Sequence, residues 1–284
     1  MKPSEGTVKR VLEYVGDFLE TSGFLDIVQA KEKVPEQAIT LAMSMDSTSV
    51  SIRKEGWKHA TAATVTTYDA EGNRLDTVYI GRMPEEGKIQ VKRLLEKEVE
   101  VVTKKHNFKH IVCIADGARD LWVFFRKKFP DAIHVVDFFH VCEHLSKLSD
   151  LLFRDEAAAK VWYKKQKTIL KEEPNGASKV IRAVRYRRSK IKENPEIEAE
   201  LKYLQRNRKR MNYFELRQKK LPIGSGIVEA ACKNLIGARL KKSGMRWTVE
   251  GGQTVLTLRS LVLSNRWEHF WSFFLSRHFP EMGT

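Results

Sequence analysis

The order of strand-like and helix-like segments between residues 39 and 137 restricts the fold more than any other feature of this sequence. Three strand-like runs come first, at 39–50 (ITLAMSMDSTSV), 59–70 (HATAATVTTYDA) and 73–83 (NRLDTVYIGRM). The second and third runs are joined at residues 71–73 (EGN), a sequence typical of a hairpin turn. Short connections between consecutive strands imply antiparallel pairing.

The pattern then changes to alternating helices and strands. A charged amphipathic helix is predicted at 85–105, a strand at 109–116 (KHIVCIAD), a helix at 118–129 and a strand at 132–137 (AIHVVD). This order requires crossover connections and parallel strands. Three antiparallel strands followed by two parallel ones predict an α/β fold with a mixed sheet of the ribonuclease-H-like type, in which the first and fourth strands are neighbours.

We expect the chain to have four parts. They are an N-terminal helical segment at 1–38 with an amphipathic helix at 7–20, the first part of the ribonuclease-H-like core at 39–137, an all-helical insertion at 138–221, and C-terminal helices at 222–284 that complete the core. Breaks in the insertion are predicted near 173–176 and 194–195, where proline and glycine occur.

Basic residues are concentrated in the helical insertion. The chain carries 51 Lys and Arg against 36 Asp and Glu, a net charge of +15. Between residues 154 and 220 there are 21 basic and 9 acidic side chains, so that +12 of the surplus lies there. Such a surplus attracts a polyanion, most commonly nucleic acid, although charged helices can also be simply solvated. We therefore expect a DNA-binding surface on the insertion.

The sequence also indicates where the protein works. No run of about 18 apolar residues and no signal peptide is present, so we expect a cytoplasmic protein without a membrane partner. The three cysteines, Cys113, Cys142 and Cys232, lack the C-x-x-C spacing of zinc sites and are far apart. They suit a reducing compartment.

Three carboxylates occupy positions where a mixed sheet would gather them. Asp46 lies inside the first strand, Asp116 ends the fourth strand, and Glu229 falls in the first turn of a helix predicted at 225–240. Neighbouring carboxylates repel unless a cation neutralises them, and oxygen ligands select Mg²⁺ or Mn²⁺. Two such ions would activate a water or a 3′-hydroxyl for attack on a phosphodiester. We therefore expect Asp46, Asp116 and Glu229 to be metal ligands and catalytic residues.

Each carboxylate also has a purely structural alternative. Asp46 can simply end a strand, and Asp116 can cap the helix that follows it. Glu229 can complement the dipole of its helix. The combination of all three with a basic insertion favours the catalytic interpretation.

The stretch DFFHVCEHL, residues 137–145, admits two interpretations. Asp137 and His140 would lie at the same sheet edge as Asp116, where they would support the metal ligands or contact DNA. In the structural alternative, Asp137 only caps a helix and His140 only packs against its neighbours. Alternatively, His140, Glu143 and His144 match the H-x-x-E-H pattern of zinc peptidases. That chemistry needs a third ligand, and no downstream residue marks one.

Three segments carry a resemblance to a known family: IADGARDLW (114–122), HVVDFFHVCEHL (134–145) and LPIGSGIVEAACKNLIGARLKKSGMRW (221–247). They resemble the DDE-type insertion-sequence transposases of the ISKra group, which is related to Mutator-like transposases. The resemblance implies that Asp46, Asp116 and Glu229 form the catalytic triad, with Asp137 and His140 as a D-x-x-H pair. It also implies a ribonuclease-H-like fold that is split by an all-helical insertion ahead of Glu229.

The resemblance gives a specific expectation for function. It implies a Mg²⁺-dependent transposase core, bacterial and nucleoid-associated, that cleaves double-stranded DNA at element ends and transfers strands into target DNA as a homo-oligomer. Four basic residues after Glu229 would hold the DNA backbone: Arg239, Lys241, Lys242 and Arg246. Only 45 residues precede Asp46, whereas relatives carry a DNA-binding region there, so the expectation is an N-terminally truncated chain.

Two other functions remain open at this point. One is an inactive DNA-binding remnant of a transposase, which would bind DNA without cutting it. The other is a structure-selective nuclease on the same fold, which would hydrolyse DNA but never join strands.

Overall fold

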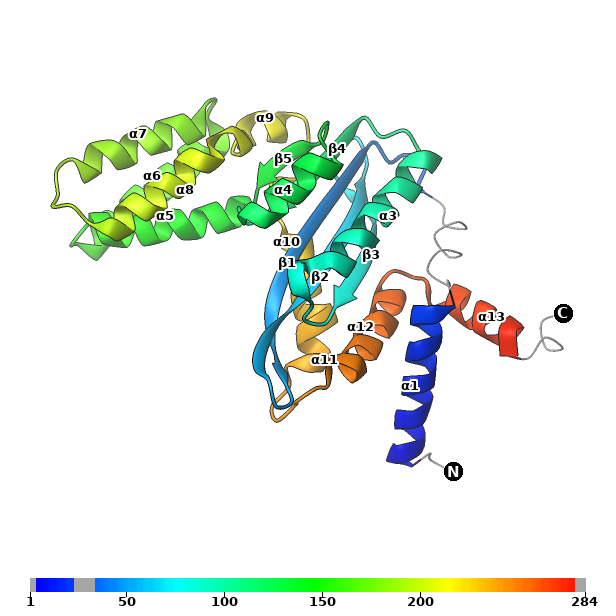
Figure 1. Cartoon of the computed structure of the whole chain (residues 1–284). Helices are drawn as coiled ribbons and strands as arrows, with labels where there is room; N and C mark the ends of the chain where they lie inside the picture. Colours follow the sequence, from blue (N-terminus) through cyan, green and yellow to red (C-terminus); the bar gives the residue numbers. More distant parts are fainter. Residues whose placement is uncertain (1–3, 23–33, 279–284) are drawn as a thin grey trace. The chain divides into compact units, whose positions relative to one another are not determined.

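The computed structural model describes residues 4–22 and 34–278 (Figure 1). The chain divides into two compact units. The first unit contains the residues up to 69, residues 73–109 and the residues from 226 onward. The second contains residues 70–72 and 110–225. Residues 23–33, which fall in the predicted N-terminal helical segment, lie outside the described residues.

The strands of the first unit are β1 (Thr40–Ile52), β2 (Gly56–Tyr68) and β3 (Arg74–Arg82). β1 pairs antiparallel with β2, and β2 pairs antiparallel with β3. These pairings confirm the three predicted antiparallel strands. The second strand begins at Gly56 rather than at 59, because Lys54 and Gly56 adopt positive φ angles of 65° and 76° and reverse the chain within three residues.

Paired hydroxyl groups connect the three strands. Ser44 and Thr64 are hydrogen-bonded at 2.8 Å between β1 and β2, and Thr66 and Thr77 at 3.2 Å between β2 and β3. Buried hydroxyls need such partners. These two pairs satisfy four hydroxyl groups of the strands within the sheet.

Helices complete the first unit. They are α1 (Glu5–Thr21), η1 (Glu86–Lys88), α3 (Ile89–Lys105), α10 (Gly226–Ala231), η3 (Cys232–Gly237), α11 (Ala238–Leu240), α12 (Val249–Leu263) and α13 (Trp267–His278). One core cluster joins Val50 and Ala60 of the strands to Leu235 and Leu256 of the C-terminal helices. A second joins α1 to α12 and α13.

Two predicted helices of this unit are interrupted. The helix predicted at 85–105 begins only at Ile89, because Gly87 and Lys88 have positive φ angles of 60° and 55°. The helix predicted at 225–240 is not continuous. Its middle, η3, is a π-helix, with Cys232, Leu235 and Ile236 all buried in the core cluster.

The second unit begins with a strand, helix, strand motif. β4 (His110–Ala115) and β5 (Ile133–Val136) pair in parallel, with Ala115 opposite Val136, and α4 (Arg119–Lys128) connects them. The predicted crossover is therefore confirmed. The carboxyl ends of both strands lie at the same edge, one residue before Asp116 and Asp137.

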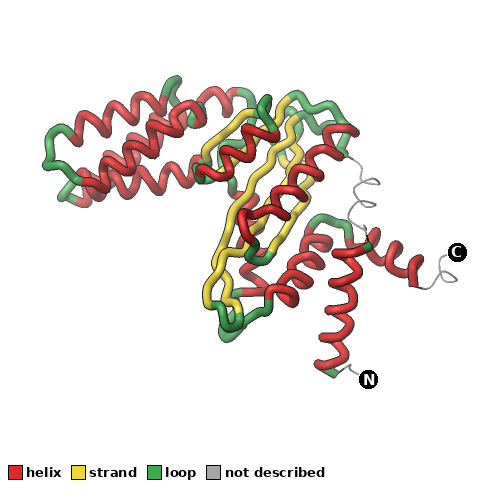
Figure 2. The backbone as a smooth tube through the Cα atoms, in the orientation of Figure 1, coloured by secondary structure: helices red, strands yellow, loops and turns green. Residues whose placement is uncertain are grey.

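The rest of the second unit is helical, as predicted. The elements are α5 (Phe138–Leu152), α6 (Glu156–Glu172), α7 (Gly176–Arg188), α8 (Pro195–Asn207), η2 (Arg208–Arg210) and α9 (Tyr213–Gln218). Helices α5 to α8 pack side by side as a bundle (Figures 1 and 2). The breaks between α6 and α7 and ahead of Pro195 fall where the sequence predicts them.

The described residues therefore form an α/β protein with five strands in both pairing directions. The ribonuclease-H-like arrangement and the four-part division of the chain stay predictions. None of the described helices combines the length and the apolar character that crossing a membrane requires.

Candidate catalytic site

Asp46 lies in an open depression on the first unit. Its place in the middle of β1, opposite Ala62 of β2, leaves the side chain partly buried. Oδ1 accepts the backbone N–H of Ser47 at 2.7 Å, and Oδ2 accepts the thiol of Cys232 at 3.6 Å. The depression has a volume of about 430 Å³, and Glu229 also lines it. Two of the three predicted catalytic carboxylates thus share one depression, although they are far apart in the sequence.

Helix α10 brings Glu229 to this place. The helix contacts β1 and β2, and its residues Val228 and Ala231 belong to the same buried cluster as Ala60 and Ala62 of β2. The alanines leave room for close approach of helix and sheet. Glu229 itself is exposed and lines the depression beside this contact.

Cys232 is a residue of this depression that sequence reasoning missed. It is only 8% exposed and lies three residues after Glu229, a spacing that puts two helical residues on the same face. Burial, and to a smaller extent the Asp46 carboxylate, raise the pKa of its thiol to about 12. The thiol therefore stays protonated near neutral pH and donates its hydrogen to Asp46. Its spacing from Glu229 is the sequence signal that would have found it.

Two lysines also line the depression. They are Lys233 and Lys241, and the Nζ of Lys241 donates to Thr48 Oγ1 at 2.9 Å. Of the residues predicted to hold DNA, Lys241 is the one that lines this depression. Arg239, Lys242 and Arg246 are exposed on the chain around it.

The segment that carries these basic residues is attached to the β1–β2 hairpin. The backbone N–H of Trp247 donates to the carbonyl of Ser51 at 3.0 Å, and that of Arg53 donates to the carbonyl of Trp247 at 2.8 Å. At the hairpin end Lys54 is exposed, and the side chain of Trp57 is 70% exposed. Two basic segments that are distant in sequence therefore lie next to each other.

Asp116 and Asp137 follow the paired ends of β4 and β5 in the second unit. The backbone N–H of Asp137 donates to the carbonyl of Ala115 at 2.9 Å, which extends the strand pairing. The Asp116 carboxylate is partly buried and accepts the backbone N–H of Ala118 at 2.8 Å. The N-cap of α4 is Ala118, so Asp116 is not the helix cap of the structural alternative.

Tyr203 of α8 holds the turn that carries Asp116. Its hydroxyl donates to the carbonyl oxygen of Asp116 at 2.8 Å, and its ring stacks on His144 with centroids 3.7 Å apart. Gly117 has a φ angle of 101° and lies directly under the Tyr203 ring. Burial, followed by the charges of Asp116 and Asp137, raises the pKa of Tyr203, so the phenol remains a neutral donor. No local pattern in the sequence marks this tyrosine as a partner of Asp116.

Asp137 caps α5, which is the structural alternative for this residue. Its buried carboxylate accepts the backbone N–H groups of Phe139 at 2.6 Å, His140 at 3.3 Å and Ser225 at 2.8 Å. Burial raises the pKa of Asp137 despite these hydrogen bonds, which lower it. The bond to Ser225 fixes the chain four residues ahead of Glu229. A supporting role of Asp137 in catalysis stays a prediction.

The residues of the H-x-x-E-H pattern are paired with carboxylates. His140 Nδ1 lies 3.0 Å from Glu143 Oε2, and His144 is hydrogen-bonded to Glu200 of α8. Glu200 is also 3.0 Å from Lys147. The contacts of His144 and Lys147 with Glu200 tie α5 to α8, whereas the contact between His140 and Glu143 lies within α5.

The donor set of the depression suits a hard cation in part. Asp46 and Glu229 offer the carboxylate oxygens that Mg²⁺ and Mn²⁺ prefer, whereas the soft sulfur of Cys232 does not suit these ions. Asp116 belongs to the second unit. Within residues 4–22 and 34–278, no group of three or more His, Cys, Asp or Glu side chains is arranged to hold a metal ion.

Comparison with solved structures gives a weak similarity. No protein-family model matches the sequence, and no curated protein matches it. Among solved structures, the chain is similar to the Drosophila P element transposase strand transfer complex, with a TM-score of 0.31 and 10% sequence identity over 99% of this chain and 75% of that chain. A TM-score of this size does not define a shared fold.

Proposed function

We propose that this protein is the catalytic core of a DDE transposase that cleaves DNA at element ends and joins strands to target DNA with the help of Mg²⁺. The observation that supports this most is the shared depression of Asp46 and Glu229, flanked by Lys233 and Lys241. Carboxylates beside lysines suit a metal-bound phosphodiester better than either charge type alone, because the lysines attract phosphate and the carboxylates attract the cation.

In this proposal the three predicted carboxylates, Asp46, Asp116 and Glu229, are the ligands of the cation. The bound Mg²⁺ would lower the pKa of a water or 3′-hydroxyl and stabilise the leaving oxygen. Lys241 would bind the DNA backbone next to Asp46, held in place by its bond to Thr48.

Other residues of the chain keep the carboxylates in position. The Cys232 thiol restrains Oδ2 of Asp46, and the backbone N–H of Ser47 restrains Oδ1. Tyr203 and Gly117 fix the turn after β4 and therefore the direction of Asp116. Such restraints matter because displacements of about 1 Å cost as much as 10²-fold in rate.

The test is a strand-transfer assay on duplexes that carry the DNA flanking the gene, in Mg²⁺ buffer. We expect Asp46→Asn, Asp116→Asn and Glu229→Gln each to lower the rate by about 10³-fold, equivalent to about 4 kcal/mol of barrier. Asp131→Asn and Glu250→Gln, exposed carboxylates away from the depression, serve as matched controls and should retain full activity.

Titration with Mn²⁺ in a calorimeter gives a second readout without DNA chemistry. Binding heat in the wild type that disappears in Asp46→Asn and Glu229→Gln supports the proposal. Activity retained by all three carboxylate variants would falsify the assignment. Hydrolysed products without joined strands would instead identify a nuclease.

A second candidate function is DNA binding without catalysis. It is favoured by the surplus of +12 basic charges between residues 154 and 220, which attracts DNA whether or not the carboxylates hold a metal ion. It predicts salt-sensitive DNA binding together with no heat on addition of Mn²⁺. The two experiments above therefore separate the candidates.

A further inference from the structure

Five cationic side chains surround one depression on the helical bundle of the second unit. They are Arg182, Arg185, Arg206, Arg208 and Lys209. The depression has a volume of about 470 Å³ and is lined by no acidic residue. All five side chains are exposed, and none forms an ion pair with a described acidic side chain.

The sequence of α7 and α8 explains how this cluster forms. Ser178, Ile181, Arg182 and Arg185 of α7 are spaced at i, i+3, i+4 and i+7, so they share one face of the helix. That face packs on α8, where Ile181 is buried. The arginines beside Ile181 are thereby placed at the border of the helix contact.

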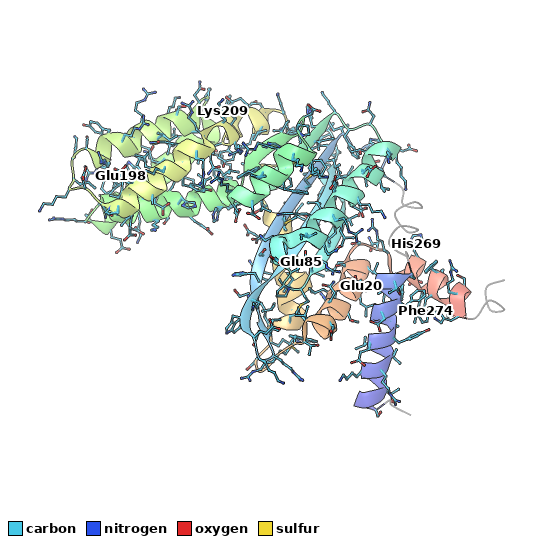
Figure 3. All side chains as sticks on the ribbon, viewed as in Figure 1. Glu20, Glu85, Glu198, Lys209, His269 and Phe274 are labelled. Carbon is cyan, nitrogen blue, oxygen red and sulfur yellow. The ribbon has the colours of Figure 1, made fainter. Side chains whose placement is uncertain are left out.

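Acidic and basic residues are separated along α8. Glu196 and Glu198 lie in its first turn, whereas Arg206 lies in its last turn and is followed by Arg208 and Lys209. Figure 3 labels Glu198 and Lys209 in these two regions. Glu198 is paired with Arg188 at 2.5 Å. This ion pair neutralises charge at the acidic end of α8, whereas the basic end has no such acidic partner among the described residues.

Complementing helix dipoles accounts for only part of this arrangement. A basic residue in the last turn of a helix stabilises it by about 0.3–1 kcal/mol at the surface. Arg182 is not in the last turn of α7, and Arg208 and Lys209 lie beyond the end of α8. Like charges gathered around one depression repel each other, and an anion would relieve that repulsion.

The extent of the positive surface indicates a polymer rather than a single small anion. Lys209 also lines an adjoining depression of about 190 Å³, where Arg210 and Lys219 outnumber the one acidic residue, Glu215. Arg210 lies over the ring of Trp122, with its guanidinium 4.6 Å from the centroid, and is thereby fixed next to Lys209. Five cations exceed what one phosphate neutralises, whereas a DNA backbone presents phosphates at regular intervals.

We propose that this arginine depression binds the phosphodiester backbone of double-stranded DNA. This inference rests on the proposed function, because it takes DNA as the polyanion, and it adds a DNA contact on the helical bundle separate from the carboxylates. The contact is electrostatic and independent of base sequence.

The test measures binding of the full-length chain to a fluorescent 30-bp duplex in EDTA at several salt concentrations. Each phosphate contact contributes about −0.9 to the slope of log K against log salt. Arg182→Gln with Arg185→Gln should therefore reduce the magnitude of the slope by about 1.8 and weaken binding about 30-fold at 0.15 M salt. The control is Lys164→Gln with Lys165→Gln, which removes the same charge from exposed residues of α6. It should change the slope and the affinity at 0.15 M salt far less than the arginine variant does.

The outcomes are distinguishable. An equal slope in wild type and Arg182/Arg185 variant, or an equal effect of the control, overturns the inference. A variant that loses stabilisation by inorganic phosphate in a thermal shift assay, but binds duplex like wild type, identifies a small-anion site instead and also overturns it. Because EDTA removes divalent ions, failure of the carboxylate tests leaves this measurement unaffected. Melting temperatures and circular dichroism confirm that the variants are folded.

Discussion

The contact between Gly117 and Tyr203 leads to a quantitative prediction for Gly117→Ala. A Cβ at position 117 would lie 2.8 Å from Cε2 and 2.9 Å from the hydroxyl oxygen of Tyr203. The ring cannot turn away without loss, since it stacks on His144 and donates to Asp116. Overpacking of this kind costs about 1–3 kcal/mol, and the φ angle of 101° adds about 1–2 kcal/mol for any residue with a Cβ. We expect a total loss of about 2–5 kcal/mol.

A double-mutant cycle separates the two contributions. In a Tyr203→Ala background the steric part disappears, so Gly117→Ala should cost only the backbone part, about 1–2 kcal/mol. Native-state hydrogen–deuterium exchange of peptides covering β4 and α4 measures the opening free energy of this region. The matched control is Gly244→Ala, where φ is 76° and no atom lies within 4 Å of the added Cβ. It should show the backbone cost alone, unchanged by Tyr203→Ala.

The cycle can also contradict the reasoning. If Gly117→Ala costs the same with and without the Tyr203 ring, the tyrosine does not fix the turn. The proposed positioning of Asp116 by Tyr203 would then lose its physical basis. A coupling energy of about 1–3 kcal/mol supports it.

Three further predictions concern buried groups. Glu98→Gln should destabilise the first unit by about 3–5 kcal/mol in urea denaturation, because the buried guanidinium of Arg266 would lose the carboxylate to which it is bonded at 2.5 and 3.2 Å; a loss below about 1 kcal/mol would contradict this. Cys232, with its pKa raised to about 12, should resist alkylation by iodoacetamide at pH 8 in the native protein and react after denaturation, as mass spectrometry of the peptide can determine. His134 has its pKa lowered by burial and by Arg210 and Arg126, so the unfolded chain binds its proton more readily than the folded one, and stability should fall as the pH drops through and below about 6.5. His134→Gln should show a smaller fall in melting temperature between pH 7 and pH 5 than the wild type, and an equal or larger fall would refute this sign.

The strands and the helical segment were predictable because their signals are local. Residues 39–83 alternate small and β-branched residues between turns, and the structure forms β1, β2 and β3 there. The breaks at 173–176 and at Pro195 follow from backbone restrictions that act wherever these residues occur. Such features need no knowledge of distant parts of the chain.

The start of the hairpin and the two interrupted helices depend on less local causes. Lys54 and Lys88 adopt positive φ angles, which cannot be predicted from a lysine. A glycine at these positions would have indicated a positive φ angle. The π-helix at Cys232–Gly237 buries Cys232, Leu235 and Ile236 in a core cluster whose other members come from distant strands and helices. Periodicity assumes a constant number of residues per turn and therefore predicted a single helix.

The sequence allowed the carboxylates of the candidate site to be predicted. It did not reveal the side chains that hold these carboxylates in position. Asp46 and Glu229 were selected from their positions in a predicted strand and helix, and the structure gives them one depression. Cys232 and Tyr203 act through contacts with distant residues, which a single sequence does not reveal. The same holds for Asp137, whose bond to Ser225 joins chain positions far apart.

The π-helix after Glu229 holds one residue more than an ordinary helical turn would. A wide turn contains one more residue than an α-helical turn, and one residue of an α-helix corresponds to a rotation of about 100°. If the segment formed an ordinary helix with all its residues, Glu229 and the basic stretch from Arg239 to Arg246 would therefore turn against each other by about that angle. Deleting the exposed Asn234 would remove the additional residue, so that an ordinary helix could keep the carboxylate and the arginines and lysines on their present sides.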